Sequence, residues 1–148
     1  ALRKTLRVNG QTQATVIEAA VSALMGDTEF TVNETHSGKS GIDTDEIGGE
    51  SHKVMVKTLS LDDFAHQQTL TRLDLIKIDV EGHEKEVALG AKQFLSCNKC
   101  LVQVELWDEK SFKSFEKIML DLNYNLLIKK NNSQNCYFTN INSSFFII

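Results

Sequence analysis

The chain has 148 residues, of which 41% are hydrophobic and 24% are charged, and its formal net charge is −4 at pH 7. These values are ordinary for a soluble globular protein, and the length suits a single domain over residues 1–148. No basic cluster exceeds the pair Lys129-Lys130, which argues against duplex nucleic acid or an anionic membrane as the main partner. No apolar run approaches the ~20 residues that cross a bilayer, and no signal peptide opens the chain, so we expect a cytoplasmic location.

The N-terminal segment predicts the end of a helix followed by two short strands. A helix is expected over residues 1–8, and Asn9-Gly10 supplies its stop. β-Branched and alanine residues predict a buried strand over 15–21. Gly26-Asp27 marks a turn, and the alternation over 29–32 predicts a second strand.

Residues 33–52 are polar and rich in Gly, Ser, Asp and Thr, and they predict the long loop of the chain. A strand is expected over 53–59, where apolar and polar residues alternate. Ser60-Leu61-Asp62-Asp63 then matches a capping box that opens a short helix. This capping role accounts for Asp62 and Asp63 without a ligand.

The second half of the chain alternates between strand and helix patterns. Strands are expected over 74–79, 101–106, 125–128, 136–139 and 145–148, helices over 83–96 and from Asp108 onward, and an Asn-rich turn at 131–135. This alternation predicts a parallel, doubly wound sheet with right-handed crossovers.

The three cysteines do not make a disulfide framework. Cys97-x-x-Cys100 superficially resembles a redox or zinc motif, but no second pair and no nearby histidine completes a metal site. We interpret Cys97, Cys100 and Cys136 as structural thiols of a reducing compartment.

The most informative segment is the apolar run from Leu73 to Val80, which carries acidic residues to the point where it stops. Asp79 ends the expected strand, Glu81 lies in the following turn, and Glu84 lies in the first turn of the next helix. Open α/β sheets bind their ligands at the carboxyl ends of such strands. These three acids are therefore candidate site residues, although they repel one another unless a positive group lies among them.

A structural interpretation of the same residues stands beside the functional one. Asp79 can accept backbone hydrogen bonds at the strand end, and Glu84 can simply favour the helix dipole. Lys77 either supplies a countercharge from within the strand or extends outward to solvent. Gly82 permits a tight bend or the close approach of a ligand.

His83 and Glu105 are the other candidates. His83 can act as a general base at neutral pH, against the commoner case of an exposed residue at a helix start. Glu105 interrupts the apolar strand over 101–106 near its carboxyl end, beside the Asp79 strand in the expected order. Because a buried carboxylate requires a partner, Glu105 is either paired or part of the same pocket.

The string from Asp74 to Glu84, followed by the segment from Glu86 to Ala91, closely resembles the FkbM family of S-adenosylmethionine-dependent methyltransferases. Further segments that look like the family cover most of residues 1–107, namely Asn9-Gly10, 16–22, 26–30, 56–64 and 102–105.

The resemblance implies an α/β fold with a Rossmann-like class I methyltransferase sheet, and transfer of a methyl group from S-adenosylmethionine. The acceptor is commonly a hydroxyl oxygen of a sugar, a polyketide or another small metabolite, so the expected partner is a small-molecule or glycan substrate. Such a displacement depends mainly on positioning, and a base near the hydroxyl helps.

The resemblance also assigns roles to residues. Ala19, Ala20 and Val21 would lie near the adenine, and Asp79 would lie near the methionine end of the cofactor and the acceptor. Glu81 is then the first candidate for the base, with His83 second. Glu84 and Glu105 are placed in the substrate pocket. A divalent metal on Asp79, Glu81 and Glu105 is a weaker alternative, and no metal site is assigned.

The family's glycine-rich loop and the acidic residue that holds the ribose are both expected upstream of residue 1. The chain has no proline and begins without methionine, which suggests a start partway through a domain. We therefore expect the sheet to lack its first two strands, which would lie between the strands at 15–21 and 74–79. The chain alone is then expected to bind the cofactor weakly or not at all.

Two readings from other classes remain open. The chain can be a non-catalytic α/β remnant that binds a partner through an exposed sheet edge. More weakly, it can be an acid-lined hydrolase, which would require two or more divalent ions. The sequence determines neither the methyl acceptor nor the oligomeric state.

Overall fold

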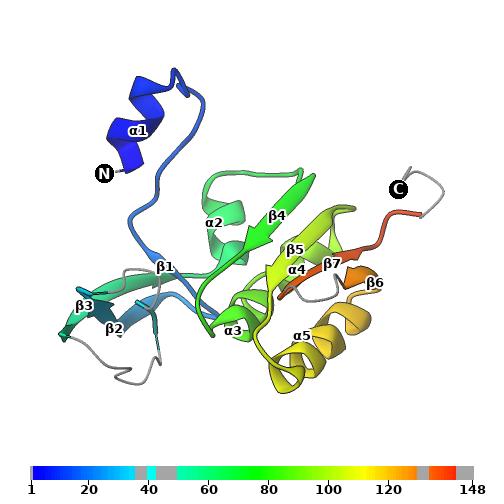
Figure 1. The fold of residues 1–148 in the computed structure, drawn as a ribbon. Coiled ribbons are helices and arrows are strands. Elements are labelled where there is room, and N and C mark those ends of the chain that lie inside the picture. Colours follow the sequence, from blue (N-terminus) through cyan, green and yellow to red (C-terminus); the bar gives the residue numbers. More distant parts are fainter. Residues whose placement is uncertain (1, 36–39, 43–49, 130–133, 143–148) are drawn as a thin grey trace.

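The computed structural model describes residues 2–35, 40–42, 50–129 and 134–142, and Figure 1 shows two sheets lying side by side. A three-stranded sheet has the order β1-β3-β2, and a four-stranded sheet has the order β4-β5-β7-β6. The architecture is thus mixed α/β, as expected. Among the described residues, no helix is long and apolar enough to cross a membrane.

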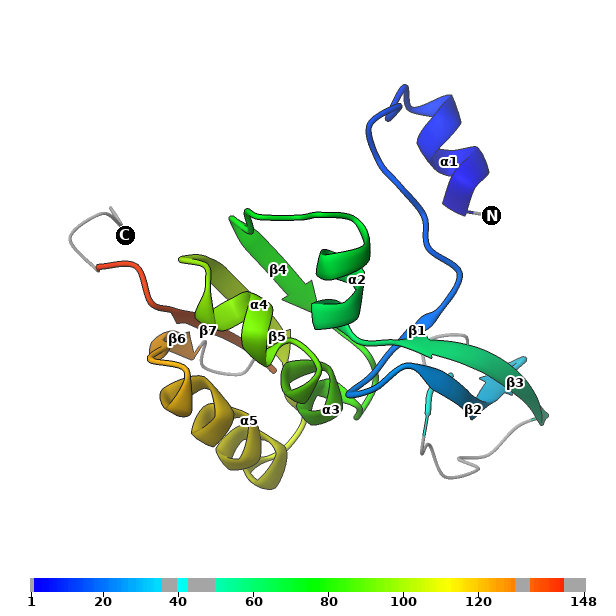
Figure 2. The same ribbon diagram turned by 180° about the vertical axis from the view of Figure 1, so that it is seen from behind.

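Helix α1 (Leu2–Val8) lies apart from the rest of the chain, as Figures 1 and 2 show, and buries none of its residues. The predicted stop is confirmed, because Gly10 has a φ of 67° and the Gln11 N–H donates to the Leu6 carbonyl over 2.9 Å. An ion pair of 3.0 Å between Arg3 and Glu18 connects the helix to the segment before β1.

The three-stranded sheet is built on the hairpin of β2 (Gly26–Asn33) and β3 (Ser51–Leu59), which pair antiparallel along their whole length. Both strands were predicted, although Gly26-Asp27 lies inside β2 rather than in the turn before it. The expected strand over 15–21 is wrong in extent. Of that segment only β1 (Ala20–Val21) pairs, parallel to β3, and β1 is an edge strand in the part of the chain that the structure describes.

The four-stranded sheet consists of β4 (Leu75–Ile78), β5 (Leu101–Glu105), β6 (Asn125–Lys129) and β7 (Asn135–Thr139). Strands β4 and β5 are parallel, as predicted, whereas β7 runs antiparallel to both β5 and β6. The expectation of a wholly parallel sheet is therefore wrong. The connection between β6 and β7 is too short for a crossover helix, so these strands pair as a hairpin. The strand predicted over 145–148 lies outside the described residues.

Helices α3 (Glu84–Leu89), α4 (Lys92–Ser96) and α5 (Glu109–Asp121) lie on one face of the four-stranded sheet (Figures 1 and 2). The core lies between these helices and the sheet, and its largest fully buried side chains are Tyr124, Phe115, Phe138, Ile78, Leu95 and Met119. Helix α5 begins as predicted, because Asp108 and Ser111 form a capping box.

The helix expected over 83–96 is instead two helices that break at Gly90-Ala91. Helix α2 (Leu61–Gln67), capped by Ser60 as predicted, explains the break. The Asp62 N–H donates to the Gly90 carbonyl over 2.8 Å, and the Asp62 carboxylate accepts the N–H groups of Gln93 and Phe94. Asp62 therefore satisfies backbone groups on both sides of the break.

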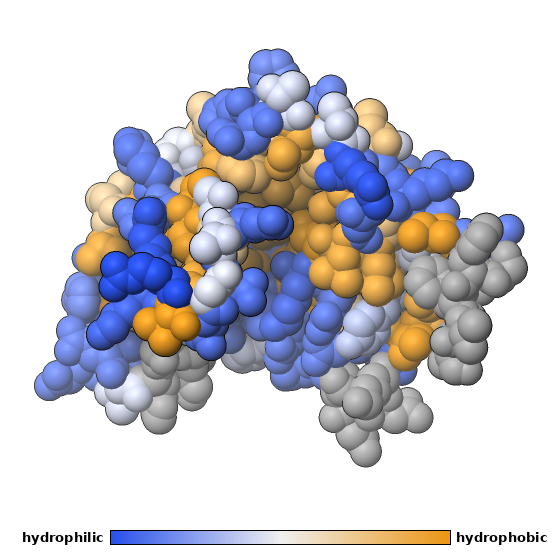
Figure 3. All heavy atoms as spheres, turned by 90° about the horizontal axis from the view of Figure 1, so that it is seen from above, coloured by the Kyte–Doolittle hydropathy of each residue, from blue (hydrophilic) through white to orange (hydrophobic). Residues whose placement is uncertain are grey.

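The opposite face of the four-stranded sheet carries no described helix. Leu75, on that face, is 56% exposed, and the outer edge of β4 has no pairing strand among the described residues. Seen from above, the molecule has a hollow with hydrophobic atoms at its base (Figure 3).

Candidate functional site

The parallel pairing of β4 and β5 brings the acidic residues of two strand ends together. Ile78 pairs with Val104, so Asp79 and Glu105 follow at the same edge of the sheet. The Lys77 ammonium donates to Asp79 Oδ2 over 2.7 Å, and this bond raises the pKa of Lys77. Both side chains are substantially exposed, so Lys77 is a countercharge at the surface rather than in the core.

Glu81 has an unusual backbone conformation and a partly buried carboxylate. It has a φ of 54°, in the left-handed region, and its Oε2 is buried without a hydrogen-bond partner among the described residues. Burial raises the pKa of Glu81, and the carboxylates of Asp79, Glu105 and Glu84 raise it further. The acids predicted from the motif therefore form one electrostatic cluster.

Glu84 is buried, and its Oε1 accepts the Gly82 N–H over 2.9 Å. Gly82 has a φ of 102°, so the turn requires glycine at this position. Glu84 thus stabilises the turn that carries Glu81, in addition to opening α3.

His83 is buried rather than exposed, and its Nε2 lies 3.0 Å from the Ser22 hydroxyl at the end of β1. Its Nδ1 lies 3.9 Å from Glu86 Oε2. The contact with Ser22 connects the three-stranded sheet to the turn of the acidic motif. The prediction of His83 as a base stays open, and the structure gives the ring a contact that the sequence did not indicate.

A cleft of about 510 Å³ lies beside this turn. Its walls come from the turn after β4, the start of α3, the end of β5 and the start of α5. The lining residues are Glu81, Gly82, Glu84, Lys85, Glu86, Leu106, Trp107, Asp108, Lys110, Ser111 and Ser114. Asp79 and Glu105 lie at the neighbouring strand ends but do not line this cleft.

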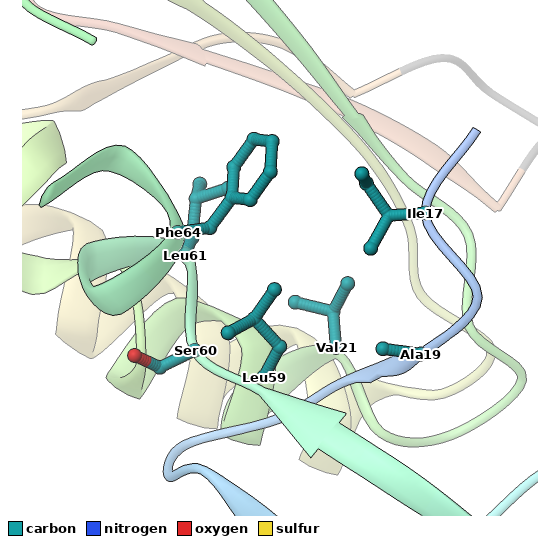
Figure 4. A pocket seen from close by; sticks show the side chains of 7 residues that line it. All are labelled: Ile17, Ala19, Val21, Leu59, Ser60, Leu61 and Phe64. Atoms are coloured by element: carbon teal, nitrogen blue, oxygen red, sulfur yellow. The ribbon is translucent and has the colours of Figure 1, made fainter. Parts of the chain in front are cut away.

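The residues expected near the adenine lie at a different place. Ala19 and Val21 line an apolar hollow of about 160 Å³, together with Ile17, Leu59, Ser60, Leu61 and Phe64. Figure 4 shows Ile17 and Phe64 facing each other across this space, while the Ser60 hydroxyl points away from it. Ala20 faces the other side of the strand from Val21 and lines another hollow with Phe30 and Met55, to which Ala19 also contributes.

Among the described residues, no group of three or more His, Cys, Asp and Glu side chains could hold a metal ion. The metal alternative on Asp79, Glu81 and Glu105 therefore has no ligand geometry to support it. The three cysteines are free thiols, and Cys100 and Cys136 are buried.

Two parts of the site were not predicted from the sequence. Trp107 directly follows the strand expected over 101–106 and precedes the helix cap Asp108, and an exposed aromatic residue at such a position is a usable signal. Ser22 carried no such signal, because its partner His83 is 61 residues away.

The fold and the acid-lined cleft define a mixed α/β protein with its candidate site at the carboxyl ends of parallel strands. The family model described as the methyltransferase FkbM domain matches residues 1–126. The chain therefore belongs to the FkbM methyltransferase domain family, as the motif resemblance predicted. No match was found among curated proteins or among solved structures.

Proposed function

We propose that this chain forms the acceptor-binding part of an S-adenosylmethionine-dependent O-methyltransferase. The methyl group would be transferred to a hydroxyl of a small molecule or glycan. The observation that carries the proposal is the cluster of carboxylates around Glu81, at the carboxyl end of β4, in a chain of a methyltransferase family.

The described residues fit such a cofactor at two places. The carboxylates of Asp79, Glu81 and Glu105 suit a positively charged sulfur, and the apolar hollow at Ala19 and Val21 suits a flat purine. S-adenosylmethionine, when bound, supplies a methyl group activated by a positively charged sulfur.

Glu81 is the proposed base, taking the proton of the acceptor hydroxyl at its carboxylate. Burial and neighbouring acids raise its pKa, which makes the ionised carboxylate a stronger proton acceptor. Glu84 holds the backbone of the turn through Gly82 and thereby orients Glu81. Lys77 holds Asp79 at the strand end.

We further propose that the two sheets are parts of one Rossmann-like sheet, with two more strands between β1 and β4. Two features of the described residues support this arrangement: no strand pairs with the outer edge of β4, and β1 pairs with β3 alone.

The test is a methyl-transfer assay with labelled S-adenosylmethionine, on the natural polypeptide with any residues that precede Ala1. Glu81→Gln is expected to lower kcat by about 10²–10⁴-fold, the usual contribution of a positioned base. Asp121→Asn, at an exposed carboxylate of α5, is the matched control and should leave the rate unchanged.

Calorimetry on residues 1–148 should detect weak or no binding of the cofactor. Micromolar affinity of this chain alone would contradict the proposed need for further strands. If the natural polypeptide neither binds the cofactor nor transfers methyl groups, the alternative holds. The alternative is a non-catalytic module, and the open edge of β4 favours it, because such an edge can pair with a partner strand.

A further inference from the structure

Trp107 is the one tryptophan of the chain, and it lies 53% exposed on the wall of the acid-lined cleft. Tryptophan is on average among the highly buried residues, so an indole left in water at a cleft suggests a ligand surface. We propose that Trp107 is the platform on which the acceptor stacks, and that the acceptor is a neutral, polyhydroxylated ring of the carbohydrate type. This inference rests on the proposed function, since it gives the acceptor of that site its chemical class.

The backbone on both sides of Trp107 is held in place. Leu106 is buried, and its N–H donates to the Gln134 carbonyl over 2.8 Å. Asp108 on the other side accepts the Ser111 N–H over 2.7 Å in the capping box of α5. Because its neighbours are fixed, Trp107 loses little backbone freedom when a ligand stacks on it.

The polar lining of the cleft offers both hydrogen-bond acceptors and donors. The acceptors are the carboxylates of Glu81 and Glu86, and the donors are the ammonium groups of Lys85 and Lys110 and the hydroxyl of Ser114. Glu84 and Asp108 also line the cleft, but Glu84 is buried and accepts the Gly82 N–H, and Asp108 is bonded to Ser111. A sugar hydroxyl both donates and accepts, so it can bond to either kind of group.

The charges of the lining disfavour an anionic ligand, because four carboxylates outnumber two ammonium groups. A neutral ligand with hydroxyl groups can also accept hydrogen bonds from the two ammonium groups, which a cation cannot do. A pyranose ring carries no charge, presents an apolar C–H face to an indole, and surrounds that face with hydroxyls. It therefore matches both the aromatic surface and the mixed polar rim.

The absence of any other tryptophan makes intrinsic fluorescence a direct probe of this cleft. Residues 1–148 are titrated, without a methyl donor, with a panel of methyl hexopyranosides and short neutral oligosaccharides. A saturable blue shift of Trp107 emission is expected for at least one member of the panel, because stacking removes water from the indole.

Variants are compared by saturation-transfer NMR of the same ligands, which does not need tryptophan. Trp107→Ala should weaken binding by about tenfold or more, whereas Trp107→Phe should keep part of it. Leu120→Ala is the matched control, because Leu120 is also 53% exposed but lies outside the cleft.

The inference is overturned if no saccharide produces a saturable response, if Trp107→Ala binds as tightly as the parent, or if a quaternary ammonium compound saturates the site while the saccharides do not. Binding is measured without cofactor, so it separates from the proposed function. Saccharide binding without methyl transfer would overturn the methyltransferase proposal alone, and methyl transfer to a non-saccharide acceptor would overturn this inference alone.

Discussion

Glu81 has an unusual backbone conformation and an unusual side-chain environment. It combines a left-handed backbone with a buried carboxylate oxygen that has no described partner. Such features cost stability and persist where the surrounding structure holds them in place. At Glu81, the neighbouring Gly82–Glu84 hydrogen bond supplies part of that support.

Glu81→Gln is expected to stabilise the chain at neutral pH but not in acid. The folded pKa of Glu81 is raised above the ordinary 4.5, so the fold favours the protonated form. The parent protein therefore loses stability as the pH rises from below 4.5 through the folded pKa, and the variant does not. Urea unfolding at a series of pH values measures the difference.

The gain in free energy of unfolding of Glu81→Gln over the parent should be smallest below the pKa of Glu81 in the unfolded chain. It should be constant above the pKa of Glu81 in the folded chain. Asp121→Asn, at an exposed carboxylate, is the control. A variant that is less stable than the parent at pH 7, or a difference that does not change with pH, would show that Glu81 is not disfavoured as an anion.

At the scale of elements, the break between α3 and α4 depends on Asp62 of α2. Its carboxylate accepts the N–H groups of Gln93 and Phe94 at the start of α4. Asp62→Ala should destabilise the chain by about 1–2 kcal/mol, as expected for loss of a helix cap. Asp62→Asn keeps an acceptor oxygen, so it should retain most of the stability that Asp62→Ala loses. Urea unfolding measures both variants. Equal losses in both variants would argue against a capping role.

Gly90 sets how closely α3 approaches the end of β1. A Cβ at this position would lie 2.2 Å from the Ser22 carbonyl oxygen, which is a backbone atom. Gly90→Ala should therefore force the two elements apart and cost about 1–3 kcal/mol, as other overpacked sites do.

Gly26→Ala is the matched control for this substitution, because the nearest atom to its Cβ is the Thr58 hydroxyl at an ordinary 3.6 Å. Thermal unfolding of both variants tests the prediction. If Gly90→Ala is no less stable than Gly26→Ala, the close approach of α3 to β1 is wrong.

At the scale of the whole molecule, one face of the four-stranded sheet and both of its edges, at β4 and β6, have no neighbour among the described residues. Parallel strands are usually covered on both faces, so Leu75 is an unusual exposed residue in this position. The proposed further strands would change its surroundings.

Leu75→Gln distinguishes a sheet whose face is exposed at Leu75 from a sheet whose face is covered there by further elements. In residues 1–148 the substitution should change the free energy of unfolding by no more than about 0.5 kcal/mol, since Leu75 is exposed. In the natural polypeptide it should cost about 2 kcal/mol if further elements cover the face. Ile78→Val, in the core, is the control and should cost about 1 kcal/mol in both. If Leu75→Gln changes the free energy of unfolding equally in residues 1–148 and in the natural polypeptide, no further element covers this face of the sheet.

The sequence predicted the elements whose signals are local. The helix caps at Ser60 and Asp108 could be predicted because each capping side chain and its partner lie three residues apart in the sequence. Alternation of apolar and polar residues predicted the strand over 53–59, and apolar runs predicted the strand over 101–106 and the strand that precedes the acidic motif. These interactions depend on neighbouring residues, so local physics is sufficient to predict them.

Only the tertiary structure decided which distant residues meet. It shortened the strand at 15–21 to Ala20–Val21, since pairing depends on neighbours that the segment itself does not specify. It placed Ala20 and Val21 on opposite sides, and it brought His83 to Ser22 and Trp107 to the acidic cleft. The sequence by itself therefore determined the family, the acidic motif and most local elements, whereas the partly buried environment of Glu81 arises from chain segments that meet only in the folded state.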